Sequence, residues 1–414
     1  MVGRSGALGA FNEVDPWSHF INIYMLDREG NRIDRRNPQD IFTPLYNHQI
    51  PPGAAQVVHY ELTVPEDSPG PLTVEVKLQY RKFDTKYMQY VFGTNFINDL
   101  PITTIAADRL TFPVAEKRAD ADTERREKVS VAEAASSPIP AWQRWNDYGI
   151  GLFLEGGERG VEKGELIQAA QAFSEVEKLG RFDGPVNLAR VYFKEGRLED
   201  AVAALQRAAK ADPPAPRWLL AWLNGQVNKQ NGFLDQAIKE FRSILEDRYP
   251  ELDARGFDFS KDYLVIDELG QTYFERAKLE RSDPDRQKSF LEKAAEQFRK
   301  TLTLDSEDLA AHYNLALIYA QLGESKLAEE HRQLHERFRP DNNAADRAIA
   351  IERRRNPAAD NAAKATVLYP LQRPGAPGLT LHAELHPLRR DQADNAGFGS
   401  PRLTSEPERP LPTP

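Results

Sequence analysis

The sequence predicts a multidomain chain of the α+β class. It divides into an antiparallel β-sandwich-like domain at 1–114, a charged linker at 115–140, an all-α solenoid of about five repeated helix pairs at 141–340, and a largely disordered Pro/Ala-rich tail at 341–414. Three observations lead to this prediction: a period-two alternation near the N-terminus, a recurring register of small and large residues in the middle, and the polar composition of the end. A length of 414 residues is enough for two to four domains.

The clearest predicted strand runs from Leu72 to Tyr80, where apolar and polar residues alternate. Because successive side chains of a strand point to opposite faces, this pattern predicts one buried face and one solvated face. The segments 19–26 and 56–64 are two further strand candidates, and Pro–Gly turns separate the candidates. Several short strands at this spacing are typical of a small antiparallel β-sandwich.

The linker and the tail differ from the rest in composition. Ala115 to Ala135 is rich in Glu, Lys, Arg, Asp and Ala, with few large apolar residues. From about residue 341 onward Ala, Asn, Arg and Pro dominate, which predicts little packed structure. One exception is Thr366 to Leu371, which we interpret as an edge strand of the N-terminal domain.

The middle of the chain repeats a pattern of small and large residues. One copy consists of Leu188, Ala189, Tyr192, Gly196, Ala201, Leu205, Ala208 and Pro213, and a second consists of Leu315, Ala316, Tyr319, Gly323, Ala328 and Pro340. The small residues let two helices approach closely, and each Gly is expected to end the first helix in a left-handed conformation. The pattern resembles the tetratricopeptide repeat, a unit of about 34 residues with two antiparallel helices. Weaker copies begin near Trp145, Asn224 and Leu269.

A solenoid of this kind exposes a concave groove, so function is expected at positions outside the repeat signature. The candidate partner-binding residues on the first helices are Asn146, Arg190, Phe193, Lys194, Trp222, Gln226, Lys229, Gln271, Phe274 and Tyr313. Aromatic and Arg side chains are typical binding anchors, which makes Trp222 and Arg190 the first choices. The alternative for each residue is ordinary packing or an idle surface position. The predicted function is a non-catalytic scaffold that binds a protein or peptide.

Composition excludes several other classes of function. A net charge of −9 disfavours nucleic acid as a partner. The absence of Cys excludes disulfides, thiolate zinc sites and covalently attached c-type haem. No apolar run is long enough to span a membrane. We find no catalytic motif and predict neither an enzyme nor a bound cofactor.

Two groups of His residues are the remaining candidates for metal chemistry. His331 and His335 are four residues apart and would share one helix face. His19, His48 and His59 fall in the predicted β domain and could bind a metal or haem iron. We favour structural or solvated roles for all five, because no third ligand is evident for the helical pair and scattered strand His residues seldom converge.

Five N-terminal segments point to a family: 14–20, 27–37, 44–53, 78–84 and 100–104. They resemble the β domain of bacterial multihaem cytochrome c proteins fused to tetratricopeptide repeats. The resemblance implies an accessory part, a split product or a truncated gene model of a periplasmic electron-transfer protein, with a multihaem cytochrome c as partner and His48 or His19 as an axial ligand. The haem-attachment residues are missing, and residues 1–6 lack an apolar signal-peptide core. The sequence therefore leaves the location open: cytoplasmic by default, periplasmic if the chain belongs to an exported cytochrome system.

Overall fold

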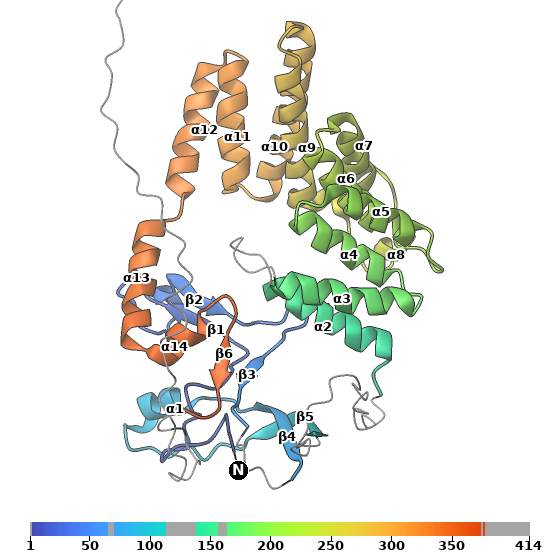
Figure 1. The fold of residues 1–414 in the computed structure, drawn as a ribbon. Coiled ribbons are helices and arrows are strands. Elements are labelled where there is room, and N and C mark those ends of the chain that lie inside the picture. The colour runs from blue at the N-terminus through green and yellow to red at the C-terminus, as the bar shows by residue number, and fades with distance from the viewer. Residues whose placement is uncertain (1, 65–69, 113–137, 156–163, 374–375, 377–414) are drawn as a thin grey trace, which may run out of the picture.

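The protein is described by a computed structural model that covers residues 2–64, 70–112, 138–155, 164–373 and 376. Its middle part consists of five antiparallel helix pairs (Figure 1). Along the chain these are α2 (Ala141–Glu155) with α3 (Gly164–Lys178), α4 (Asp183–Lys194) with α5 (Leu198–Ala209), α6 (Arg217–Gln230) with α7 (Leu234–Glu246), α9 (Tyr263–Leu279) with α10 (Pro284–Leu304), and α11 (Leu309–Gln321) with α12 (Ser325–Phe338). The predicted array of repeated pairs is confirmed.

In three of the pairs, the two helices pack closely where a glycine on the first helix faces a Phe ring on the second. A Cβ atom added at Gly225 on α6 would lie 2.5 Å from the ring of Phe241 on α7. The same relation joins Gly149 to Phe173 and Gly270 to Phe298. In pair α4–α5, Ala189 takes the place of the glycine and Leu205 takes the place of the Phe, and both lie in the core. A larger residue on one helix is therefore matched by a smaller residue on the other, because the space between the two helices is closely packed.

Left-handed glycines end the first helix of the two strongest copies, as predicted. Gly196 has φ 75° and Gly323 has φ 81°. An L side chain in this region of backbone space is strained, which explains the choice of Gly at both positions. An insertion separates α7 from α9 and holds the short helix α8 (Pro250–Asp253) and a 3₁₀ turn at Phe259–Lys261.

The strands of the described residues do not form the predicted β-sandwich. They make three separate two-stranded sheets: antiparallel β1 (Ile23–Leu26) with β2 (Thr43–Asn47), parallel β3 (His59–Glu61) with β6 (Leu368–Pro370), and antiparallel β4 (Leu72–Tyr80) with β5 (Thr103–Phe112). The alternation correctly predicted β4, but Val76 is 52% exposed. Within the described ranges no second sheet covers that apolar face.

Two shorter elements complete the N-terminal region. A 3₁₀ turn spans Pro38–Asp40, and helix α1 spans Thr85–Phe92. The carboxylate of Asp84 caps α1 by accepting a hydrogen bond from the backbone N–H of Tyr87 at 2.8 Å. An Asp at this position satisfies one of the donors that every helix start leaves free.

The chain folds further beyond the repeats than its composition predicted. Helices α13 (Asn342–Arg355) and α14 (Pro357–Ala362) lie in the region expected to be disordered. They fold because a few apolar residues on each helix, among them Ala359, pack against β1 and β2. The expected edge strand is confirmed as β6, which pairs with β3. Residues 377–414 and most of the predicted linker lie outside the described residues.

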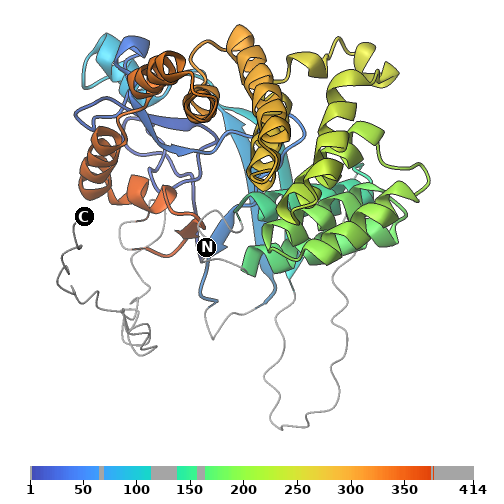
Figure 2. The ribbon, with the colours of Figure 1, turned by 90° about the horizontal axis from the view of Figure 1, so that it is seen from above.

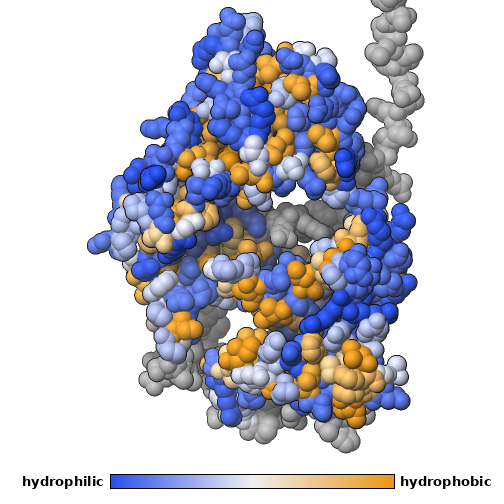
Figure 3. Space-filling model, turned by 180° about the vertical axis from the view of Figure 1, so that it is seen from behind, coloured by the Kyte–Doolittle hydropathy of each residue, from blue (hydrophilic) through white to orange (hydrophobic). Residues whose placement is uncertain are grey.

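The N-terminal region contacts both ends of the helical array. On one side, Nε2 of His59 lies 2.8 Å from Oε2 of Glu155 on α2. On the other, the hydroxyl of Tyr24 donates a 2.6 Å hydrogen bond to Oε1 of Glu352 on α13. Figures 1 and 2 show the strands between α2 and α13, and Figure 3 shows the surface hollowed between the strands and the repeats. The array is therefore closed into a ring by its own N-terminal region. No helix within the described ranges is long and apolar enough to cross a membrane.

Candidate functional site: the face of the first helices

The first helices of successive pairs lie side by side, and hydrogen bonds join α2 to α4 and α6 to α9. We call the surface formed by α2, α4, α6, α9 and α11 the groove face. Contacts join α2 to α4, α4 to α6, and α9 to α11. All ten residues that the sequence proposed for partner binding lie on these five helices.

Arg190 lies on α4, where the groove face carries two basic side chains, Arg190 and Lys194. Its Nη1 donates a 2.9 Å hydrogen bond to Oδ1 of Asn187, and its guanidinium lies 4.7 Å from the ring centroid of Phe153 on α2. The amide of Asn187 donates in turn to Oδ1 of Asn146 at 2.9 Å. Burial lowers the pKa of Arg190. Among the described residues no carboxylate lies within ion-pair distance of this guanidinium.

Lys194 lies beside Arg190, one turn further along α4. Its Nζ is 4.8 Å from the ring centroid of Phe153 and 3.3 Å from the backbone carbonyl oxygen of the same residue. The side chain of Lys194 is exposed, whereas Phe193 is half-buried and packs against the core. The structure thus brings Arg190 and Lys194 together around one aromatic ring, and Asn187 links Arg190 to Asn146.

Further along the groove face, Lys229 and Gln271 are also brought together. Nζ of Lys229 on α6 lies 2.7 Å from Oε2 of Glu268 and donates a 3.0 Å hydrogen bond to Oε1 of Gln271, both on α9. Beside them Asp267 is 7% exposed and accepts a hydrogen bond from the hydroxyl of Thr301. Burial raises the pKa of Asp267 to about 7. The groove face is therefore basic at α4 and carboxylate-rich at α9.

The predicted aromatic anchors differ in exposure. Tyr313 on α11 is 52% exposed, with its ring 5.5 Å from that of His335. Trp222 is half-buried against Phe241, and Gln226 is half-buried one turn further along α6. Phe274 is only 5% exposed and belongs to the core, so its prediction as an exposed anchor is wrong. Helix α9 contacts α7, α10 and α11, and these contacts cover that ring.

The helical histidines contact different partners. Nδ1 of His331 lies 2.9 Å from Nδ1 of His312 on α11, whereas His335 contacts Tyr313. Burial and the neighbouring His312 lower the pKa of His331. The sequence analysis did not single out His312, which is buried. The two helical histidines are thus not directed at a common point.

The histidines of the N-terminal region lie close together. The ring of His19 stacks on His48 at 5.0 Å. Nδ1 of His19 is 3.0 Å from the hydroxyl of Tyr369, and Nε2 is 3.1 Å from Oε1 of Gln56. Both ring nitrogens of His19 are thus engaged. No group of three or more His, Asp or Glu side chains in the described ranges is arranged to hold a metal ion.

Sequence reasoning missed three members of the groove face: Phe153, Asn187 and Glu268. Each belongs to a first helix, and each contacts a residue that was proposed. Their signal was their register relative to the repeat signature, because Asn187 and Glu268 both immediately precede the signature pair of large and small residues.

Comparison with known proteins agrees with the helix pairs. The tetratricopeptide-repeat family model matches residues 161–216 and 285–343. No curated protein matches the chain. Among solved structures, MamA MSR-1 is 17% identical, with a TM-score of 0.34 over 48% of this chain and 95% of that chain. Another MamA protein is 16% identical, with a TM-score of 0.35 over 48% of this chain and 91% of that chain. The chain thus contains tetratricopeptide repeats, in the two segments that the family model matches.

Proposed function

We propose that this protein is a non-catalytic scaffold that binds a protein or peptide partner on the groove face. Tetratricopeptide repeats build extended surfaces whose exposed positions are free to vary with the partner. On the groove face those positions combine exposed Lys194 and Tyr313 with the half-buried Arg190. Arg and aromatic side chains are enriched among the residues that dominate binding energies.

The observation that carries the proposal is the environment of Arg190. Its guanidinium is half-buried, yet its described partners are the neutral Asn187 amide and the Phe153 ring. A buried charge is normally paired, because desolvation without an opposite charge is costly. A carboxylate supplied by the partner would complete this site, and the planar guanidinium favours two-pronged recognition. The preferred partner segment is therefore acidic where it meets α4.

Quantitative affinity capture tests this function. The tagged full chain is incubated with an extract of the source cells, and partner recovery is compared for wild type, Arg190→Gln and Trp222→Ala. The matched control is Arg242→Gln, which removes an exposed Arg from second helix α7, where it pairs with Glu246. We expect partner recovery to fall about 30-fold for Arg190→Gln, which corresponds to the loss of about 2 kcal/mol at a binding hot spot.

Two outcomes would reject the groove as the binding site: equal recovery with wild type and Arg190→Gln, or equal loss with Arg242→Gln. A variant can also lose the partner because it unfolds. Circular dichroism and thermal unfolding of each variant separate this case from a binding defect. Trp222→Ala provides a second, independent position on the same face.

The N-terminal resemblance suggests a specific partner, a multihaem cytochrome c. Because both ring nitrogens of His19 are engaged, we do not propose that residue as a haem ligand. The prediction is instead that a c-type cytochrome docks on the groove face. Captured fractions with haem absorbance that disappears with Arg190→Gln would support this partner, and haem-free fractions that still depend on Arg190 would leave the scaffold function with another protein.

A further inference from the structure

The structure contains a cavity away from the groove face, where three distant parts of the chain meet. Its volume is about 620 Å³. The walls come from the segment between Phe11 and Tyr46, from helix α1 with the residues that flank it, and from α14 near the end of the described chain. Cavities of about 300–1,000 Å³ at the junction of separate parts of a fold are the usual sites of small ligands.

One part of the cavity wall is apolar. Phe11, Val14 and Phe20 line it from the N-terminal segment, and Ala358 and Ala362 line it from α14. The alanines leave the space open, because a longer side chain at either position would project into it. The cavity is thus shaped for an apolar body rather than for a fully hydrated ion.

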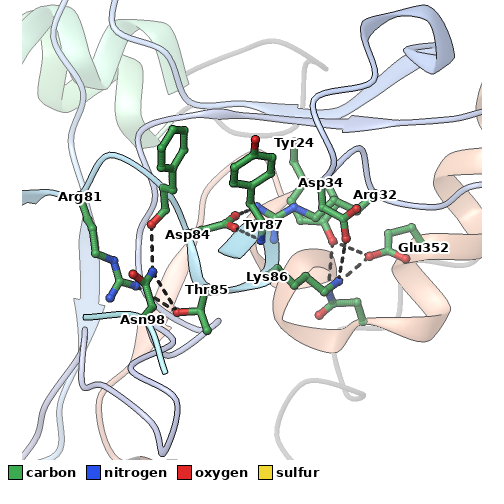
Figure 4. A network of polar contacts seen from close by, with 12 residues as sticks. Tyr24, Arg32, Asp34, Arg81, Asp84, Thr85, Lys86, Tyr87, Asn98 and Glu352 are labelled. Atoms are coloured by element: carbon green, nitrogen blue, oxygen red, sulfur yellow. Dashed lines mark hydrogen bonds and ion pairs between the residues drawn. The ribbon is translucent and has the colours of Figure 1, made fainter. Parts of the chain in front are cut away.

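Charged side chains form another part of the wall (Figure 4). Three cations, Arg32, Arg81 and Lys86, face two carboxylates, Glu13 and Asp84, so the lining carries one net positive charge. The carboxylate of Asp84 is also engaged by the start of α1. Lys86 is paired with Asp34, which lies outside the lining, and Arg32 is paired with Asp84. Arg81 is therefore the cation left for a negatively charged ligand.

Arg81 is the cation best placed to receive that charge. Its Nη1 donates a 2.7 Å hydrogen bond to the backbone oxygen of Asn12, and its Nη2 lies 3.4 Å from the Thr85 hydroxyl. Burial lowers the pKa of Arg81. Among the described residues no carboxylate lies within ion-pair distance of its guanidinium. The charge of Asp84 acts on Arg81 only from beyond ion-pair distance, and with five N–H groups Arg81 has donors to spare for a ligand.

Arg32 and Asn22 add specificity to the same cavity. Arg32 lies 4.8 Å from the ring centroid of Tyr24 and 3.4 Å from the Asp84 carboxylate, which leaves it able to share a second anion. The amide oxygen of Asn22 is buried with no hydrogen-bond partner in the described part of the chain. Such an acceptor is costly when it stays unpaired. A hydroxyl or N–H that the ligand carries in addition to its carboxylate would satisfy it.

We propose that this cavity binds a small amphiphilic carboxylate, with its carboxylate at Arg81 and Arg32 and its apolar body against Phe11, Phe20 and α14. The ligand contacts the N-terminal region and α14 at once, so it joins the two sides of the ring closure. Its binding is independent of the groove face, which lies on other helices.

Calorimetric titration of the full chain tests the site. The probes are decanoate and 2-naphthoate, which separate an aliphatic from an aromatic body, with decanol and decylamine as neutral and cationic counterparts. We expect one carboxylate to bind with 1:1 stoichiometry and at least tenfold more tightly than decanol and decylamine. Binding of neither carboxylate, or equal binding of decylamine, would overturn the proposal.

Two kinds of variant locate the bound probe. Ala362→Leu and Ala358→Leu fill the apolar part, and Arg81→Gln and Arg32→Gln remove the cations; each is expected to weaken carboxylate binding at least tenfold. Ala203→Leu, an equal change at an exposed position on α5, is expected to leave binding unchanged. Thermal unfolding identifies variants that no longer fold. If the folded variants from both sets bind the probe as wild type does, the cavity is not the site.

Discussion

The hydroxyl of Tyr24 on β1 donates a 2.6 Å hydrogen bond to the carboxylate of Glu352 on α13, and both residues are buried. This contact links the start of the chain to the first helix after the repeats. Asn356 donates to the same carboxylate oxygen at 3.3 Å. A buried carboxylate with two donors is stable only while the N-terminal region and α13 remain in contact.

Tyr24→Phe is therefore expected to destabilise the protein. The substitution keeps the ring and removes only the donor, which leaves Glu352 with a weaker partner set. We expect a loss of about 1–3 kcal/mol in the free energy of unfolding, measured by urea denaturation. Tyr90→Phe is the matched control, because Tyr90 is 62% exposed. An equal effect of the two substitutions would show that the Tyr24 hydroxyl does not stabilise the closure.

The glycine–phenylalanine contacts predict a compensating pair of substitutions. Gly225→Ala places a methyl group 2.5 Å from the Phe241 ring, so we expect a loss of about 1–3 kcal/mol despite the better helix propensity of Ala. Gly270→Ala is expected to cost less, because the closest ring atom of Phe298 would lie 3.1 Å away. Adding Phe241→Leu to Gly225→Ala should restore part of the stability. A stabilising Gly225→Ala, seen in thermal unfolding, would contradict this account.

His19 makes the fold sensitive to acid. Burial and the neighbouring His48 lower the pKa of His19 from 6.5 to about 4. Between these two values the unfolded chain binds the proton and the folded chain does not, so stability is lost as the pH falls from about 6.5 to 4. The contribution is at most about 3 kcal/mol. Unfolding experiments between pH 4 and 7 should show a weaker pH dependence for His19→Gln. Parallel curves for the variant and wild type would exclude this residue as the cause.

Asp267 has the opposite effect on the pH dependence of stability. Burial raises its pKa from 3.8 to about 7, so the folded chain holds a proton that the unfolded chain releases, and stability is lost as the pH rises through this window. Asp267→Asn keeps an oxygen that can accept from Thr301 and removes the buried charge. We expect the variant to exceed wild type in stability at pH 8, by up to about 4 kcal/mol, and to approach it at pH 4. A variant that is less stable than wild type at pH 8 would contradict the raised pKa.

The sequence was informative where structure depends on local spacing. The helix pairs, the left-handed Gly196 and Gly323, and strand β6 were predicted because their signals lie within one helix, one turn or one strand. The β-sandwich was predicted wrongly, because the alternation in β4 shows that the strand has an apolar and a polar face but not what covers the apolar face. Helices α13 and α14 were missed because their polar composition conceals the few apolar residues that pack on the strands, Ile349 on α13 and Ala359 on α14.

For the groove face too, local spacing predicted the positions of residues but not their contacts. Register correctly placed Arg190 and Lys229 on first helices, but their partners Asn187 and Glu268 depend on how neighbouring helices meet. The exposure of Phe274 was predicted wrongly for this reason, since three other helices surround α9. The cavity beside α14 joins segments too distant in the chain for any local pattern to reveal.

The closure of the ring has a consequence for evolution. An open array of repeats can gain or lose a unit at little cost, because each unit contacts only its neighbours. Here the bond His59–Glu155 holds α2 at the start of the array, and the bond Tyr24–Glu352 holds α13, the helix that follows the array, to the same N-terminal region. A duplication or deletion of one helix pair would misalign both attachments at once, so the number of pairs is constrained to stay at five.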